Sequence, residues 1–135
     1  MQKTSSRFDT ALFSVAALWN FAIGSSAFAL DLHFELLFND ANRLVDPLAR
    51  LYPQLTFGFV LFFGFGYAMI ALRPDKNRGF VTLATIAKVT AFASISYFYF
   101  VGVLPFLAFS AGLGDLIFAF LFAHFLWRNR EQGWI

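Results

Sequence analysis

The sequence contains no cysteine, few charged residues and only two histidines, and each scarcity narrows the possible functions. Without cysteine the chain has no disulfide, no thiol nucleophile and no cysteine-ligated metal or iron–sulfur centre. Only 13% of its 135 residues are charged, against about a quarter in a soluble domain. The net charge of +2 gives no indication of nucleic-acid binding.

The two histidines do not suit a haem or a metal ion. A bis-histidine haem needs two imidazoles facing one site, but we expect His33 in an outer loop and His124 near the opposite membrane surface, beside Trp127. No His/Asp/Glu spacing matches a metal site, and there is no phosphate-binding loop or Ser/His/acid set. The sequence therefore predicts no metal and no catalytic residues, and it identifies no cofactor.

The sequence is rich in apolar residues, which gather in long runs: 59% of its residues are hydrophobic, and 21 are phenylalanine. A membrane-spanning helix needs roughly 20 mainly apolar residues, and barrel strands would alternate polar and apolar positions instead. The sequence therefore predicts an all-α fold, a four-helix transmembrane bundle that forms a single domain over residues 1–135. The predicted spans are Ala11–Leu30, Leu55–Leu72, Phe80–Val101 and Val103–Trp127.

Lysine and arginine are distributed unevenly between the two sides of this bundle. Seven lie on the side of the termini and only two, Arg43 and Arg50, on the other. The seven are Lys3, Arg7, Arg73, Lys76, Arg78, Arg128 and Arg130. Because cytoplasmic loops carry an excess of basic residues, we expect both termini in the cytoplasm. Arg73, Lys76 and Arg78, in the loop RPDKNRG, are candidates for contact with anionic lipid, although the topology rule alone accounts for them.

Two segments allow alternative interpretations. The first 29 residues resemble a secretory signal with an A-x-A-like site at Ala27–Ala29, but Asp9 and Asn20 interrupt its regions, so we expect a retained first span. The outer segment Leu30–Pro53 has apolar residues at near-helical spacing. We expect one or two short amphipathic helices there, which either cap the bundle or form a lid over a pocket.

Lys88 is a charged residue inside an apolar run. A charge at the bilayer centre costs roughly 2.5–3.5 kcal/mol on insertion scales, so such residues normally face the protein interior and have a partner. Lys88 lies about 12 Å deep in its span and Asp115 about 18 Å deep in the next, and a short turn makes these two spans antiparallel neighbours. We therefore expect a Lys88–Asp115 pair.

Further polar groups lie at similar depth. Asn20, about 15 Å deep, shares a stripe of small residues on the first span, and the Tyr67 hydroxyl of the second span is within reach. Such small-residue faces allow close helix packing. The polar centre Asn20, Tyr67, Lys88 and Asp115 either holds four helices in one register, or it lines a ligand pocket or relays a proton.

The segments WNFAIG and GDLIFAFLFAHFLW, with the four-span layout and the amphipathic outer loop, resemble the DoxX-like group of small bacterial four-helix membrane proteins. That resemblance implies a bacterial inner-membrane protein. The group includes subunits of respiratory oxidases, and its thiol-redox members use cysteine pairs that are absent here. No residue role transfers from it.

Two functions follow. The first is a non-catalytic membrane subunit or interaction partner in a larger complex, with lipid and other membrane subunits as partners. The alternative is a binder or carrier of a small hydrophobic ligand, a quinone or lipid, in the bundle core. The predicted lipid-facing aromatic residues are Phe57, Phe59, Phe63, Phe98, Phe100, Phe118, Phe120 and Phe122.

Overall fold

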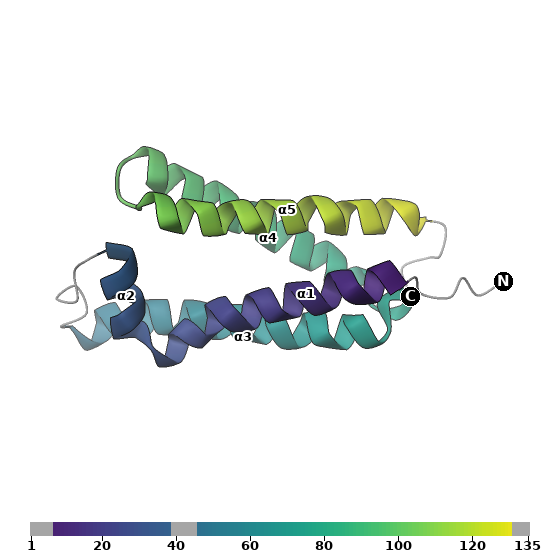
Figure 1. Ribbon diagram of the computed structural model, residues 1–135, viewed down its shortest axis with the longest axis horizontal. Helices are drawn as coiled ribbons and strands as arrows, with labels where there is room; N and C mark the ends of the chain where they lie inside the picture. The colour runs from purple at the N-terminus through teal and green to yellow at the C-terminus, as the bar shows by residue number, and fades with distance from the viewer. Residues whose placement is uncertain (1–6, 39–45, 131–135) are drawn as a thin grey trace.

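The computed structural model describes residues 7–38 and 46–130, and every regular element in these ranges is helical (Figure 1). The α-helices are α1 (Arg7–Gly24), α2 (Leu30–Phe38), α3 (Pro47–Leu72), α4 (Arg78–Phe100) and α5 (Phe106–Arg128), with the 3-10 helices η1 (Ser25–Phe28) and η3 (Pro74–Lys76) between them. Four of them, α1 extended by η1, α3, α4 and α5, are long and apolar enough to cross a membrane. This confirms the all-α class and the presence of four helices of membrane-spanning length.

The second span begins eight residues earlier than predicted, at Pro47 instead of Leu55. Asp46 caps the helix by accepting a hydrogen bond from the backbone N–H of Leu48, at 3.3 Å, and Pro47 occupies a first-turn position that suits proline. Pro53 lies within the second turn, where its missing N–H removes one helical hydrogen bond without ending the helix. The outer segment therefore contains α2 and the start of α3, with residues 39–45 outside the described ranges.

The four long helices form two antiparallel pairs, α1 with α3 and α4 with α5 (Figure 1). The turn between α4 and α5 is short because Gly102 adopts a positive φ of 78°. There Gly102 N–H donates to Tyr99 O and Val103 N–H to Phe98 O, which is the Schellman ending of a helix. The start of α1 and the end of α5 lie at the same end of the molecule.

Aromatic side chains fill the space between the two pairs toward that end. Phe13 of α1 and Phe122 of α5 are fully buried, with ring centroids 5.2 Å apart, and Tyr67 of α3 contacts Phe122 at 5.3 Å. Phe118 and Phe122 were expected to face lipid, and that expectation is wrong, since both are buried. They follow Asp115 by three and seven residues and so share its inward face.

The α1–α3 pair depends on a close approach at Gly24. A Cβ atom added to Gly24 would lie 2.7 Å from the backbone nitrogen of Leu61 in α3. Only glycine allows the two backbones to come this close, as small residues do at many membrane helix interfaces. Gly58 of α3 has no atom within 4 Å of such a Cβ, and it therefore provides a matched control.

We expect Gly24→Ala to lower the free energy of unfolding by about 1–3 kcal/mol, because overpacking would push α1 away from α3. Gly58→Ala should cause no loss and gain up to about 1 kcal/mol from helix propensity. Unfolding of both variants in the same detergent micelles measures the difference. Equal stability of the two variants would contradict the close approach.

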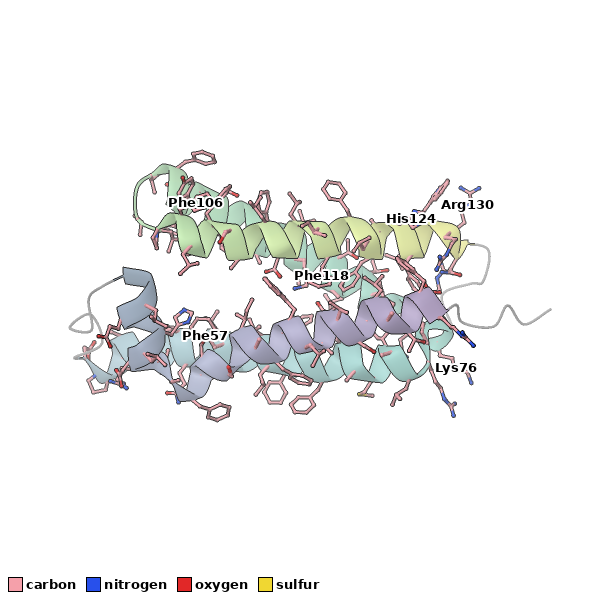
Figure 2. All side chains as sticks on the ribbon, viewed as in Figure 1. Phe57, Lys76, Phe106, Phe118, His124 and Arg130 are labelled. Atoms are coloured by element: carbon pink, nitrogen blue, oxygen red, sulfur yellow. The ribbon has the colours of Figure 1, made fainter. Side chains whose placement is uncertain are left out.

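Helix α2 packs over the start of α3 through His33. The His33 ring lies 4.4 Å from the Phe57 ring, centroid to centroid, and its Nδ1 is 2.9 Å from the Ser26 hydroxyl. Figure 2 shows Phe57 at the end of the bundle occupied by α2. Partial burial lowers the pKa of His33 below its ordinary value of 6.5, because desolvation disfavours the charged imidazolium.

A lowered folded-state pKa means that the unfolded chain binds more protons than the folded chain as the pH falls through 6.5. The free energy of unfolding should therefore decrease as the pH is lowered from 7.5 to 5. Thermal unfolding at both pH values tests this, with His33→Phe as the control that keeps a ring against Phe57 but does not titrate. A wild-type pH dependence no larger than that of His33→Phe would contradict the role of His33.

Candidate functional site

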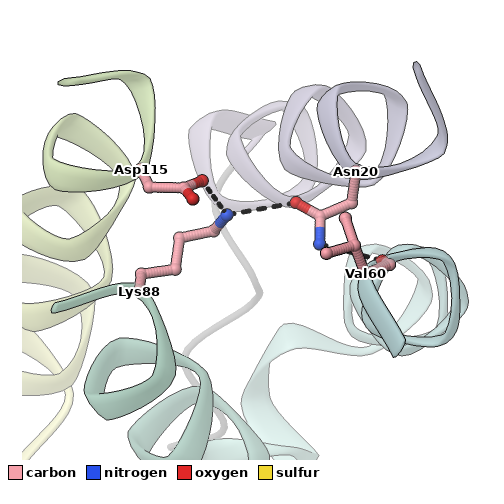
Figure 3. A network of polar contacts seen from close by, with 4 residues as sticks. All are labelled: Asn20, Val60, Lys88 and Asp115. Atoms are coloured by element: carbon pink, nitrogen blue, oxygen red, sulfur yellow. Dashed lines mark hydrogen bonds and ion pairs between the residues drawn. The ribbon is translucent and has the colours of Figure 1, made fainter. Parts of the chain in front are cut away.

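Lys88 lies buried in the middle of the bundle, with 5% of its surface exposed. Its Nζ atom donates to Asp115 Oδ1 at 2.5 Å and to Asn20 Oδ1 at 3.1 Å. The Asn20 side-chain amide in turn donates to the backbone oxygen of Val60 at 3.1 Å. Figure 3 shows this polar cluster, Asn20, Val60, Lys88 and Asp115, in which each residue comes from a different long helix.

Small residues make the Lys88–Asp115 contact possible. Gly112 precedes Asp115 by three residues, and a Cβ atom there would lie 3.0 Å from the Ile95 side chain of α4. On α4, Ala84 lies one turn before Lys88 and is fully buried. These positions bring α4 and α5 close together and leave room for the long lysine stem to point inward.

The Asn20–Val60 contact depends on the close approach already described at Gly24. Gly24 lies one turn after Asn20 on the same face of α1, and it meets Leu61, the neighbour of Val60. A short amide side chain can therefore reach a backbone oxygen of α3. Because one end of the amide donates to Val60, its oxygen is directed toward Lys88.

Tyr67 contributes its ring to the cluster. The Lys88 Nζ atom lies 5.7 Å from the Tyr67 ring centroid and 5.4 Å from that of Phe118, within the range of cation–π attraction. The sequence placed the Tyr67 hydroxyl within reach of the polar centre. Among the described residues, however, this hydroxyl forms no hydrogen bond with Asn20, Lys88 or Asp115. The aromatic faces therefore help to stabilise the ammonium charge instead.

A cavity of about 260 Å³ lies against the polar cluster. All four long helices line it, and its wall includes all four residues of the predicted polar centre, Asn20, Tyr67, Lys88 and Asp115. The rest of the wall is mainly apolar. The cluster thus separates two halves of the bundle, one filled by the aromatic core toward the termini and one hollow toward α2.

Sequence reasoning missed part of this wall. Phe59 and Phe63 were expected to face lipid, yet both line the cavity, together with Thr56. Phe59 lines the cavity and also faces outward, because 64% of its surface is exposed. The spacing of Phe59, Phe63 and Tyr67, one turn apart on α3, was a signal in the sequence that these three residues share a face.

The three basic loop residues lie in different environments in the structure. Arg73 and Lys76 are exposed, and Figure 2 shows Lys76 at the end of the bundle that also carries Arg130. Arg78 is buried, with 4% exposed, and donates to the backbone oxygen of Leu126 at 3.3 Å. The side chain of Arg78 therefore turns inward at the start of α4, unlike those of Arg73 and Lys76. Lipid contact by Arg73 and Lys76 stays a prediction.

No metal-binding group is apparent in the parts of the chain that the structure describes, where no three His, Cys, Asp or Glu side chains gather. His33 lies in α2, and His124 is exposed near Trp127, with ring centroids 6.1 Å apart. The two histidines lie toward opposite ends of the bundle. The polar side chains on the cavity wall, Asn20, Lys88 and Asp115, can form hydrogen bonds and ion pairs.

Comparison with known proteins adds no relative: no protein-family model, curated protein or solved structure matches the chain. The resemblance to the DoxX-like group therefore stays a prediction.

The Lys88–Asp115 pair should respond differently to single and double substitution. Lys88→Met leaves a carboxylate without its cation inside the bundle, so we expect a loss of about 3–5 kcal/mol in the free energy of unfolding. Lys88→Met combined with Asp115→Leu removes both charges and should recover much of that loss. Unfolding in detergent micelles provides the comparison. A single variant as stable as the wild type would rule out a structural role for the pair.

Proposed function

We propose that this chain is an integral membrane protein that binds a small lipid-soluble molecule, a quinone or a lipid, in the cavity between its two helix pairs. The observation that carries this proposal is the 260 Å³ cavity with Asn20, Lys88 and Asp115 on its wall. Ligand sites are typically concave and largely apolar, with a few polar groups that fix the orientation of the ligand.

The cavity favours ligand binding over a purely structural ion pair. A pair that only holds helices in register needs no cavity beside it, whereas a ligand site needs a concave, largely apolar wall with a few polar groups. The sequence alone ranked a subunit role first and ligand binding second. The cavity reverses that order, because it gives the polar cluster a space in which to contact another molecule.

We propose that a ligand enters the cavity beside α3. Thr56 and Phe59 belong to its wall and are also exposed on the outside of the bundle. A molecule dissolved in the bilayer can reach this opening from the side, without passing through water. Binding, carrying or presenting such a molecule requires no catalytic residue, and we propose a non-catalytic role.

We further propose that both termini face the cytoplasm, with α2 on the outer side of a bacterial inner membrane. Arg73, Lys76, Arg128 and Arg130 are exposed or half-buried at the end where α1 begins and α5 ends. This gathering of basic residues, together with the count over the whole sequence, follows the positive-inside rule.

A second candidate is the subunit role, which the outer face of α4 favours. Thr90, Ala93 and Ser94 are exposed there, beside larger exposed residues such as Ile86 and Tyr97. Small and hydroxyl-bearing residues on a membrane helix favour packing against another helix. This face is compatible with a protein neighbour that leaves the cavity accessible.

Filling the cavity tests the main proposal. Ala91 of α4 lines the cavity, whereas Ala93 faces outward on the same helix. We expect native mass spectrometry of protein extracted from its own membrane to show a small molecule retained by the wild type and by Ala93→Leu. Ala91→Leu should lose most of it, because the added side chain occupies the binding space.

The other outcomes are equally informative. Retention by Ala91→Leu at the wild-type level would contradict binding in this cavity. A bare chain in all three samples would contradict the proposal itself. Another protein that copurifies stoichiometrically with the wild type but dissociates from Ala93→Leu would support the subunit role of the α4 face.

A further inference from the structure

Lys88 has hydrogen-bonding capacity that the protein does not use. An ammonium group carries three N–H donors, and two of them are accepted by Asn20 and Asp115. No third acceptor for Nζ is found in the described part of the chain. The rings of Tyr67 and Phe118 lie 5.7 and 5.4 Å away, which is too far to accept a hydrogen bond. Because Lys88 lines the cavity, its third N–H is available to a bound molecule.

The charge of the cluster limits what that molecule can be. Lys88 and Asp115 form a balanced pair, and Asn20 is uncharged, so the polar cluster has no net charge. An anionic head group would add an uncompensated negative charge in a region of low dielectric, and a cationic one would add a positive charge. An uncharged group with a hydrogen-bond acceptor avoids both costs.

The shape of the wall points to a flat molecule. Phe59, Phe63 and Tyr67 follow each other at four-residue spacing on α3 and all line the cavity. The Phe63 and Tyr67 rings lie 6.2 Å apart, centroid to centroid, at an interplanar angle of 48°. Three aromatic rings along one wall provide offset or edge contacts to another ring more readily than to a flexible chain.

We infer that the cavity selects an uncharged, planar carbonyl compound of the quinone type, whose carbonyl oxygen accepts the third N–H of Lys88. The ring lies along Phe59, Phe63 and Tyr67, and any hydrocarbon tail leaves toward the bilayer past Phe59. This inference rests on the proposed function, since it specifies the ligand class of the same cavity. Asn20 and Asp115 act as positioning residues that direct the ammonium toward the carbonyl oxygen.

Three probes with alkyl tails of nine or ten carbons separate the possibilities: a decyl benzoquinone, decylbenzene and decanoate. Binding is measured for the full chain in lipid nanodiscs at pH 7.5, with empty nanodiscs correcting for partition into the bilayer. We expect the wild type to bind the benzoquinone at least about tenfold more tightly than decylbenzene or decanoate, the effect of one hydrogen bond from a charged donor. Lys88→Met with Asp115→Leu should remove the preference over decylbenzene.

The outcomes distinguish this inference from the proposed function. Equal binding of all three probes, or tightest binding of decanoate, overturns the carbonyl inference while leaving the cavity as a binding site. No binding of any probe overturns both. If the double variant fails to fold, the wild type still provides a test. The benzoquinone carbonyl should absorb at a lower infrared frequency when it is hydrogen-bonded to the Lys88 ammonium than when the benzoquinone is dissolved in empty nanodiscs. An unshifted carbonyl band in the bound benzoquinone overturns the inference.

Discussion

The arrangement of this bundle depends on one constraint, the need to give a lysine ammonium acceptors inside a layer that contains almost no water. Lys88 obtains them from Asp115 on α5 and Asn20 on α1. Asn20 in turn is held by a backbone oxygen of α3. Each contact requires close helix packing, so Gly24 and Gly112 are as necessary to the cluster as its polar groups. The position of the buried charge thus determines where small residues are needed on the neighbouring helix faces.

The polar cluster divides the bundle into unlike halves. Toward the termini, the rings of Phe13, Phe122 and Phe125 fill the space between the helix pairs, and an ion pair joins Asp9 of α1 to Arg128 of α5. Toward α2, the same two pairs leave a cavity between them. One half therefore holds the pairs together, and the other half has room for a third component. The candidate site lies at their boundary.

Much of this could be predicted from the sequence, for reasons that also explain the failures. The four spans follow from apolar length, and the partnership of Lys88 and Asp115 follows from depth, because a charge in an apolar run has few possible partners. The direction of Phe118 and Phe122 did not follow, since in a lipid-embedded helix apolar residues face both lipid and core. Arg78 was named as a candidate lipid contact from its charge and its place in a loop. Neither property shows that its side chain turns inward. The cavity depends on how two helix pairs meet, which no local pattern encodes.

The position of the ion pair within one helix pair affects how the protein enters its membrane. Lys88 emerges from the ribosome 27 residues before Asp115, so α4 is first presented to the bilayer with an uncompensated charge. Once α5 has been made, the short turn at Gly102 brings the carboxylate beside the ammonium. Helices α4 and α5 therefore enter most favourably together, as a neutral hairpin. The α1–α3 pair, which carries no buried charge at its centre, can insert earlier and supply Asn20 to a hairpin that is already electrically balanced.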